Sequence, residues 1–438
     1  MPKRATTVYV CSECGEEYLQ WQGRCSNCGN WNTIQKFHLS QPHTAEKGAG
    51  YAGTEAAAPI PLASVQGQEE QRFPSGFSEV DRVLGGGIVA GSVILLGGDP
   101  GIGKSTLLLQ LAERIADARH PVLYVSGEES PEQIKLRAVR LGMTAGSISL
   151  LAATNISRIE QIIEEGKPRL VVIDSIQTMY DEDFPSTPGS IVQVRESALR
   201  LQRIAKRLAI PMVLVGHITK EGTVAGPRTL EHLVDVVLYL EGENKEQLRI
   251  LRAVKNRFGD SSETGIFAME EQGMTEVSNP GNFLLQERVQ APGSVLSAVM
   301  EGSRPLLIEV QALTTPSLFG YPRRTSSGFD LNRLNLLLAV LQKRAGVNLS
   351  NQDVFINIVG GLKIKDPALD AAVCVALASA HKEVALPETL CVIGEIGLAG
   401  ELRRVSQQER RIKEIKNLGY TTPKPVKSLG QLVGSVLR

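Results

Sequence analysis

The sequence has no net charge, no long apolar run and few cysteines. Its 47 Lys and Arg residues balance 47 Asp and Glu residues over a length of 438. A neutral chain has no global attraction to nucleic acid, so any such contact must come from a local basic patch. No apolar stretch approaches the roughly 18 residues that cross a bilayer, and no apolar segment precedes Cys11. These absences predict a cytoplasmic protein without a membrane partner or an export signal, and the length predicts two or three domains.

Four of the six cysteines form two Cys-x-x-Cys pairs, which read Cys11-Ser-Glu-Cys14-Gly and Cys25-Ser-Asn-Cys28-Gly. Four thiolates favour a closed, tetrahedral and structural zinc site, so Cys11, Cys14, Cys25 and Cys28 are the candidate Zn²⁺ ligands. Because so short a segment has too small a core, the metal would supply its folding energy. Two disulfides or a redox pair are the alternatives, and the missing export signal disfavours them.

The remaining cysteines and both tryptophans have simpler interpretations. Trp21 and Trp31 flank the second cysteine pair. They can stack on a base or on a partner, but the favoured interpretation is that they cap the small core of this segment. Cys374 and Cys391 each stand alone in an apolar run, so we expect both to be ordinary small core residues.

Composition divides the chain into four parts. Residues 1–38 contain the cysteine pairs, and residues 39–72 are rich in Ala, Gly, Pro, Gln and Glu, which predicts a flexible linker. From 73 to 275, apolar strand patterns alternate with helical patterns, and a second pattern of this kind covers 282–438. The alternation predicts an α/β fold whose first sheet is mostly parallel, with helices on both faces.

The expected elements can be named by their residues. In the first pattern the strands are Val93–Gly97, Val122–Val125, Leu170–Asp174, Met212–Gly216, Val236–Leu240 and Leu248–Val254, and the helices are Leu107–Ala118, Pro131–Leu141, Ile156–Glu165 and Ile191–Leu208. In the second pattern the helices are Leu334–Arg344, Pro367–Ala380 and Gln407–Leu418, and the strands are Val354–Val359 and Cys391–Gly394.

A complete phosphate-binding loop stands between the first expected strand and the first expected helix, and it reads Gly-Asp-Pro-Gly-Ile-Gly-Lys-Ser. Its glycines let backbone N–H groups face phosphate oxygens, and the helix N-terminus adds positive potential. Lys104 can reach the β and γ phosphates, and the Ser105 hydroxyl can bind Mg²⁺. The motif predicts an ATP site formed by Gly98, Asp99, Pro100, Gly101, Ile102, Gly103, Lys104, Ser105 and Thr106.

Carboxylates follow two of the other expected strands. Glu128 and Glu129 come after a strand that we expect beside the P-loop strand, where a carboxylate can orient the attacking water, with Glu128 slightly favoured. The alternative is an acid that merely suits the start of the next helix. Leu170-Val-Val-Ile-Asp174 is a Walker B pattern, which would bring Asp174 to the Mg²⁺ ion.

Two loops and one basic segment are candidate DNA contacts. The two loops are Asp181–Ser190 and Thr219–Arg228, and the second contains Lys220 and Arg228. Either these loops move with the nucleotide state and bind DNA, or they are plain surface loops. His217, before the second loop, either senses the γ-phosphate or has no special role. The C-terminal basic segment either contacts phosphates or is a solvated helix face, and it contains Arg403, Arg404, Arg410, Arg411, Lys413 and Lys416.

The core resembles the RecA-type ATPases, and the stretch Phe77–Gly87 with the Glu128-Glu129 pair is similar to the KaiC group. Lys255-Asn-Arg-Phe-Gly259, at the end of an expected strand, resembles a motif of the RadA family of bacterial DNA repair proteins, also called Sms. In that family the motif contributes to a site completed across a subunit boundary. The resemblance therefore implies that Lys255 and Arg257 stabilise the charge on a neighbour's ATP. A salt-bridged strand end is the alternative.

The C-terminal part resembles the Lon protease domain in the stretches that begin at Asp330, Gly360 and Gly394. Lon proteases use a serine activated by a lysine, but Pro-Ala-Leu-Asp-Ala-Ala follows Asp366, and Gln407-Gln-Glu-Arg-Arg411 stands where the lysine is expected. Because such a dyad needs both members, we expect no peptidase activity. The resemblance implies a scaffold for six-membered rings and a DNA platform.

Taken together, the resemblance implies a hexameric, DNA-dependent ATPase and helicase that drives branch migration of recombination intermediates in DNA repair. Its implied partners are single-stranded and branched DNA, the RecA recombinase and further copies of this chain, and its implied cofactors are ATP, Mg²⁺ and Zn²⁺. The alternatives are a KaiC-like signalling ATPase without a DNA partner, an active Lon-type protease, and a zinc-dependent docking protein without enzymatic activity.

Overall fold

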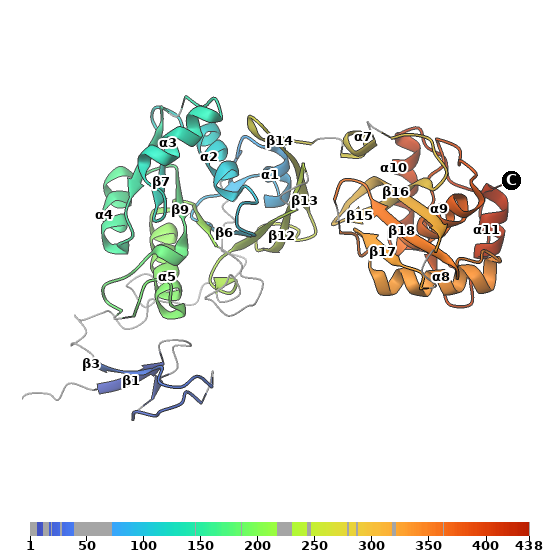
Figure 1. Cartoon of the computed structure of the whole chain (residues 1–438). Coiled ribbons are helices and arrows are strands. Elements are labelled where there is room, and N and C mark those ends of the chain that lie inside the picture. Colours follow the sequence, from blue (N-terminus) through green and yellow to red (C-terminus); the bar gives the residue numbers. More distant parts are fainter. Residues whose placement is uncertain are drawn as a thin grey trace, which may run out of the picture. The chain divides into compact units, whose positions relative to one another are not determined.

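A computed structural model of the chain (Figure 1) describes residues 7–11, 17–18, 20–26, 29–38, 72–144, 146–184, 186–216, 230–242, 247–277, 280–285, 288–317, 321–361 and 363–437. Cys14, Cys28, His217, Lys220 and Arg228 lie outside these residues, as does nearly all of the predicted linker. The chain forms two compact units, one of Met1–Tyr239 with Val254–Gly259 and one of Leu240–Ala253 with Asp260–Arg438. The four-part division made from composition stays a prediction.

The described part of the N-terminal segment forms a small antiparallel sheet. More than half of the Trp21 and Trp31 surfaces is exposed, 58% and 69%, so the interpretation that they cap the core is wrong. Two tyrosines pack against this core instead. The strands, in spatial order, are β2 (Glu17–Tyr18), β1 (Thr7–Cys11) and β3 (Ile34–His38), and the core consists of Cys11, Cys25 and Ile34 with Tyr9 and Tyr18 against them.

Within the described residues, nine strands form one mixed sheet. The pairs that join β6, β10, β9, β7 and β8 are parallel, whereas β12 with β13 and β13 with β14 are antiparallel. All residues of the P-loop strand β6 are buried, which explains its uninterrupted apolar sequence. In spatial order the strands are β14 (Gly273–Glu276), β13 (Thr264–Glu270), β12 (Leu248–Asn256), β11 (Val236–Glu241), β6 (Val93–Gly98), β10 (Met212–Val215), β9 (Leu170–Asp174), β7 (Val122–Ser126) and β8 (Ile148–Ala152).

Helices cover both faces of this sheet, as predicted. Successive side chains of a strand point to opposite faces. On one face, α4 (Ile156–Gly166) and α5 (Ile191–Leu208) pack with alternate residues of the central strands, such as Val93 and Leu95. The helix α2 (Lys104–Ile115) contacts β6, β7 and β9 but does not belong to that cluster, so it covers the other face. It begins three residues before the predicted start because the polar P-loop residues are already helical.

Further short elements belong to the ATPase core. The helix α3 begins with a capping box, in which Ser130 accepts the amide of Gln133 and the Gln133 side chain accepts the amide of Ser130. This capping explains why a helix starts directly after Glu128 and Glu129. The remaining elements are β4 (Arg72–Phe73), α1 (Ser78–Leu84), β5 (Ile88–Val89), α3 (Pro131–Arg140) and the 3₁₀ helix η2 (Ile176–Thr178).

The second unit contains a four-stranded sheet among its described residues, in which β15, β16 and β18 are antiparallel and β17 is parallel to β18. The predicted strand Cys391–Gly394 is wrong, because Cys391 makes only an isolated bridge with Leu296. The elements are α7 (Pro280–Leu285), β15 (Ser294–Glu301), β16 (Arg304–Pro316), β17 (Arg324–Ser327), α8 (Leu331–Ala345), β18 (Gln352–Ile358), η3 (Pro367–Leu369), α9 (Asp370–Lys382), β19 (Glu395–Ile396), β20 (Leu402–Arg403), α10 (Gln408–Asn417) and α11 (Leu429–Val436).

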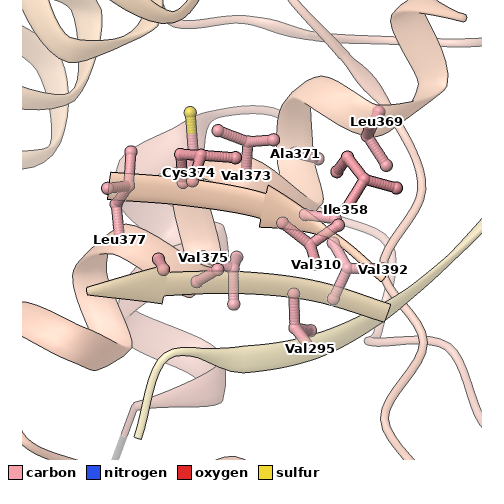
Figure 2. Close-up of a cluster of buried hydrophobic side chains, with 14 of the residues drawn as sticks. Val295, Val310, Ile358, Leu369, Ala371, Val373, Cys374, Val375, Leu377 and Val392 are labelled. Carbon is pink, nitrogen blue, oxygen red and sulfur yellow. The ribbon is translucent and has the colours of Figure 1, made fainter. Parts of the chain in front are cut away.

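The core of this unit lies between α9 and the strands β15 and β16 (Figure 2). Every residue of α9 from Asp370 to Ser379 is buried, which explains its almost purely apolar sequence. Cys374 and Cys391 are fully buried, as predicted. Burial raises the pKa of both thiols far above the usual range, so neither is a reactive cysteine.

Candidate functional site

The P-loop connects the buried end of β6 to the first turn of α2. Gly101 has a φ of 77° and Gly103 has a φ of 114°, which are left-handed conformations that favour glycine. The loop therefore needs glycine at these positions to turn its backbone N–H groups inward. Ile102, between them, is buried with 1% of its surface exposed and anchors the loop to the protein.

Lys104 folds back over this loop. Its Nζ donates hydrogen bonds to the carbonyl oxygens of Gly98, at 2.8 Å, and Asp99, at 3.0 Å. Burial lowers the pKa of Lys104, and the nearby carboxylates of Asp174, Asp99 and Glu128 oppose this shift. Among the described residues the hydrogen bonds of this buried ammonium go to two carbonyl oxygens, and a bound triphosphate would stabilise the charge further, so the lysine is suited to phosphate binding.

Asp174 stands at the end of β9, where the Walker B pattern predicts it. The hydroxyl of Tyr124, on the neighbouring strand β7, donates to Asp174 Oδ2 at 2.6 Å. In the described part of the chain, the other oxygen, Oδ1, accepts no hydrogen bond. Burial and the Asp174 charge raise the pKa of Tyr124 well above its usual value, so the phenol stays a hydrogen-bond donor. Tyr124 positions the carboxylate; the one hint in the sequence is a tyrosine in a buried aliphatic strand.

Glu128 and Glu129 follow β7 but have different partners. The Ser175 hydroxyl donates to Glu128 Oε1, whereas Arg137 of α3 donates to Glu129 Oε1 in an ion pair. Glu128 is thus held beside the Walker B strand, and Glu129 is held against α3. The expectation that their strand lies next to the P-loop strand is wrong, because β10 and β9 lie between β6 and β7.

The P-loop, both glutamates and Asp174 border a single cavity of about 350 Å³. Two arginines that sequence reasoning missed, Arg137 and Arg140, line it from α3. Their spacing of three residues places them on one side of a helix, but the sequence does not say which way that side faces. The cavity is lined by Gly101, Gly103, Lys104, Ser105, Thr106, Ser126, Glu128, Glu129, Arg137, Arg140 and Asp174.

Lys255 and Arg257 lie at the opposite end of β6 from the P-loop. Arg257 Nη1 donates to Asp235 Oδ1 at 3.2 Å, and Asp235 Oδ2 accepts the amide of Val93, the first residue of β6, at 3.0 Å. A strand rises about 3.3 Å per residue, so the two ends of β6 are on the order of 17 Å apart. Arg257 is therefore remote from the phosphate-binding loop of the same chain.

The pentapeptide that begins at Lys255 is held by backbone groups of the same unit. Lys255 Nζ donates to the carbonyl oxygens of Glu231, at 2.7 Å, and Val234, at 2.8 Å. Burial and the adjacent Arg257 charge lower the pKa of Lys255. The two cations are thus close enough to repel each other, and an approaching anion would relieve that repulsion.

Asp235 is a buried carboxylate that accepts several hydrogen bonds, and sequence reasoning missed it. Besides Arg257 and the amide of Val93, its carboxylate accepts from Lys206 Nζ at 2.7 Å, and its side chain is 3% exposed. Only the Arg257 partner is well exposed, at 53% of its side chain. The salt-bridged strand end that the sequence left as an alternative is therefore present, and half of the Arg257 surface is open to solvent.

The C-terminal basic segment is less uniform than its sequence indicates. Arg403, Arg404 and Arg410 are exposed, but Arg411 is completely buried, so the prediction that it contacts phosphates is wrong. Arg411 Nη1 forms an ion pair with Asp366 Oδ2 at 2.6 Å and donates to the carbonyl oxygen of Ala298 at 2.8 Å. It supports α10 from inside. Lys413 and Lys416 of α10 are exposed.

This burial leads to a stability prediction. Breaking a buried ion pair leaves the other charge uncompensated, which costs about 3–5 kcal/mol. Arg411→Ala should therefore lower the unfolding temperature of the second unit by roughly 10 °C, measured by calorimetry on the full chain. Arg410→Ala, an exposed neighbour on the same helix, is the matched control and should change stability by less than about 0.5 kcal/mol. Equal effects of the two variants would contradict the buried role of Arg411.

The candidate metal ligands are only partly described. The thiols of Cys11 and Cys25 are buried in one small cluster, where Cys11 Sγ is 3.2 Å from Thr33 Oγ1 and Cys25 Sγ is 3.1 Å from the Tyr18 hydroxyl. Over the ranges that the structure describes, no group of three metal-binding side chains is found, and Cys14 and Cys28 are outside those ranges. The buried pair of thiols fits half of a four-cysteine site.

Two family models match parts of the chain. The family model of the AAA domain matches residues 61–223, and that of the rubredoxin metal binding domain matches residues 9–36. A solved KaiC-like protein from Pyrococcus horikoshii is 21% identical, with a TM-score of 0.40, over 48% of this chain and 99% of that one. No helix in the described ranges has the length and apolar content to cross a membrane.

Three features together define a RecA-like P-loop ATPase. They are the order of the strands in the sheet, the glycine-rich loop with its buried lysine, and the carboxylate at the end of β9. DNA repair protein RadA of Bacillus subtilis is 48% identical over 95% of this chain and 92% of its own length. RadA of Halalkalibacterium halodurans is 48% identical over 94% and 91%, and RadA of Listeria monocytogenes is 47% identical over 95% and 91%. The chain belongs to the RadA family.

Proposed function

We propose that this ATPase acts in DNA repair, where it moves along single-stranded DNA and drives branch migration of intermediates made by the RecA recombinase. The observation that carries the ATPase part is the single cavity shared by Lys104, Glu128 and Asp174. The DNA part is supported by the name of the relatives, DNA repair protein RadA, which match nearly the whole chain.

In the proposed reaction, Glu128 accepts a proton from water as the water attacks the γ-phosphate, and ADP leaves in line with it. Lys104 balances negative charge on the phosphates. Ser105 and Asp174 would hold Mg²⁺, which neutralises phosphate charge, and the hydroxyl of Tyr124 supports this assignment by orienting Asp174. Arg137 keeps Glu129 away from the water because it pairs with that carboxylate.

The site is proposed to be completed by a neighbouring copy in a hexameric ring. Lys255 and Arg257 are remote from the P-loop of their own chain, which supports their assignment to an ATP site that a neighbouring protomer provides. When Arg257 turns toward a phosphate, Asp235 would keep its ion pair with Lys206. The movement would therefore not leave a buried carboxylate without a counter-charge. Hydrolysis would then depend on assembly.

The C-terminal unit is proposed to be a ring scaffold and DNA platform without peptidase activity. The position after Asp366 carries no serine, and Asp366 itself is engaged by Arg411 and by the backbone amides of Met300 and Ala368. Arg403, Arg404 and Arg410 are exposed and can contact phosphates without reading sequence. The cysteine pairs are proposed to hold a structural Zn²⁺ ion.

The test of this function is the response of the full-length protein to DNA. We expect single-stranded DNA to raise the rate of ATP hydrolysis, and we expect the protein with ATP to move the branch point of a three-strand intermediate made by a recombinase. Both activities should fall as salt rises, because phosphate contacts release counterions. ATP hydrolysis that is indifferent to DNA, with no branch movement, would favour a KaiC-like signalling ATPase instead.

A further inference from the structure

Both tryptophans of the chain lie on the N-terminal ribbon, and both are exposed to an unusual extent. The sequence contains two tryptophans, Trp21 and Trp31, whose surfaces are 58% and 69% exposed. Tryptophan is normally well buried because it carries the largest apolar surface of any side chain. Two exposed rings on so small a domain therefore indicate a binding surface.

The two rings border the same glycine. A Cβ atom at Gly23 would lie 3.7 Å from Cη2 of Trp21 and 3.8 Å from Cζ3 of Trp31. Both distances are ordinary van der Waals contacts, so both rings border one position that carries no side chain. The absence of a side chain at Gly23 leaves the surface between the rings open.

Backbone and side-chain hydrogen bonds hold this surface in place. The amide of Asn32 donates to the carbonyl oxygen of Gly23 at 2.8 Å, next to an antiparallel bridge between Arg24 and Trp31. The indole Nε1 of Trp21 donates to the carbonyl oxygen of Ile34 at 3.1 Å. The rings are thus positioned before any ligand arrives, which reduces the entropy lost on binding.

The chemistry around the rings favours nucleic acid. The sequence from 20 to 38 contains no aspartate or glutamate, and it contains amides and two basic residues, Arg24 and Lys36. The guanidinium carbon of Arg24 lies 5.8 Å from the Trp31 ring centroid, and Arg24 Nε donates to the carbonyl oxygen of Gly29 at 2.9 Å. A cation held beside an exposed aromatic face, in a stretch of sequence from 20 to 38 that carries no carboxylate side chain, is suited to accept both a base and its phosphate.

We propose that Trp21 and Trp31 form a stacking platform for unpaired bases of single-stranded DNA, with Arg24 beside it for the phosphates. This inference rests on the proposed function, which brings such DNA to the protein. Base stacking on an aromatic ring does not depend on sequence, because every base has a π face. The platform would therefore hold single strands of any sequence, as a protein that moves along DNA requires.

The experiment uses tryptophan fluorescence of the full-length protein. Because the chain has no other tryptophan, emission excited at the red edge of the absorption band reports this surface alone. Titration with a thymidine oligonucleotide should quench this emission, and a duplex of equal length should quench it much less because its bases are already stacked. Anisotropy of a labelled oligonucleotide gives the total DNA affinity in parallel.

Gly23 offers variants that keep both fluorophores. Gly23→Leu would cover the rings and should abolish the quenching, whereas the matched control Gly23→Ala adds one ordinary contact and should retain it. Trp31→Ala should weaken the binding of the oligonucleotide on the order of tenfold, and Trp31→Phe should restore most of it, because the stacking ring returns. The zinc content of each variant shows whether the ribbon has folded.

Three outcomes would overturn the inference. They are no quenching by single-stranded DNA, equal quenching in Gly23→Leu, and quenching by a recombinase filament in place of DNA. If these occur while anisotropy still reports DNA binding and DNA still stimulates ATP hydrolysis, the platform is refuted and the proposed function stands. Loss of DNA binding and of stimulation in the unmodified protein would refute the proposed function itself.

Discussion

Glu128→Gln should reduce the rate of ATP hydrolysis by about 10²- to 10⁴-fold, which is the usual contribution of a positioned general base. Glutamine has the same shape and can still accept the Ser175 hydroxyl, so the site should keep its geometry. The side chain can no longer accept the proton of the attacking water. The effect should therefore appear in kcat, whereas the binding of a fluorescent ATP analogue should stay close to that of the unmodified protein.

Glu129→Gln is the matched control, since the two glutamates are adjacent and both border the cavity. The structure pairs Glu129 with Arg137 of α3. Its replacement removes one ion pair and should change kcat by much less than the Glu128 variant does. If Glu129→Gln is inactive and Glu128→Gln is active, the assignment of the base must be exchanged between them.

The parts of the site that could be predicted from the sequence are those encoded by neighbouring residues. The P-loop needs glycines, a lysine and a serine at fixed positions in a short stretch of sequence. Glu128 and Asp174 each stand at the end of an apolar strand pattern that can be seen in the sequence. Gly98–Ser105, Glu128 and Asp174 were therefore predicted as site residues from the sequence, and the structure places Glu128, Asp174 and part of this loop around one cavity. The helix and strand patterns of the ATPase core agree with the structure to within a few residues for the same reason.

The parts that could not be predicted depend on which strands become neighbours. Tyr124 reaches Asp174 only because β7 pairs with β9, and the chain order does not specify that pairing. Asp235 supports Arg257 only because β11 starts beside the start of β6. Strand β8 was missed because its residues are mostly half-buried or exposed, which weakens the apolar pattern of an edge strand.

Arg411 and the tryptophans show a different limit. A run of arginines and lysines suggests a solvated face, but burial is set residue by residue, and Arg411 turns inward to Asp366. Tryptophans near a small core suggest caps, but tyrosines fill that place and the indoles remain exposed. Residue type alone does not predict burial when similar side chains, such as neighbouring arginines or the aromatic residues of one small domain, occupy both buried and exposed positions.

Mixing two inactive variants should restore hydrolysis if Arg257 acts on a neighbouring protomer. Arg257→Ala should reduce ATP hydrolysis on the order of 10³-fold, as for other arginines supplied from outside a site, yet leave DNA binding intact. Its own P-loop and Glu128 remain functional. A neighbouring Glu128→Gln subunit still carries Arg257, so the interface between the two contains one complete site. In an equal mixture, about a quarter of the sites should be complete.

The control for this experiment mixes two variants whose substitutions both lie in the part of the site that a single protomer provides. Lys104 and Glu128 border one cavity in one protomer, so Lys104→Ala mixed with Glu128→Gln cannot generate a complete site and should stay inactive. Arg257→Lys keeps a cation beside Asp235 and should retain more activity than Arg257→Ala, because the charge remains although the planar, two-point contact is lost. If the mixture of Arg257→Ala and Glu128→Gln stays as inactive as its components, Arg257 does not act across a subunit boundary. The Asp235 pair would then be its whole role, and hydrolysis would not require a neighbour.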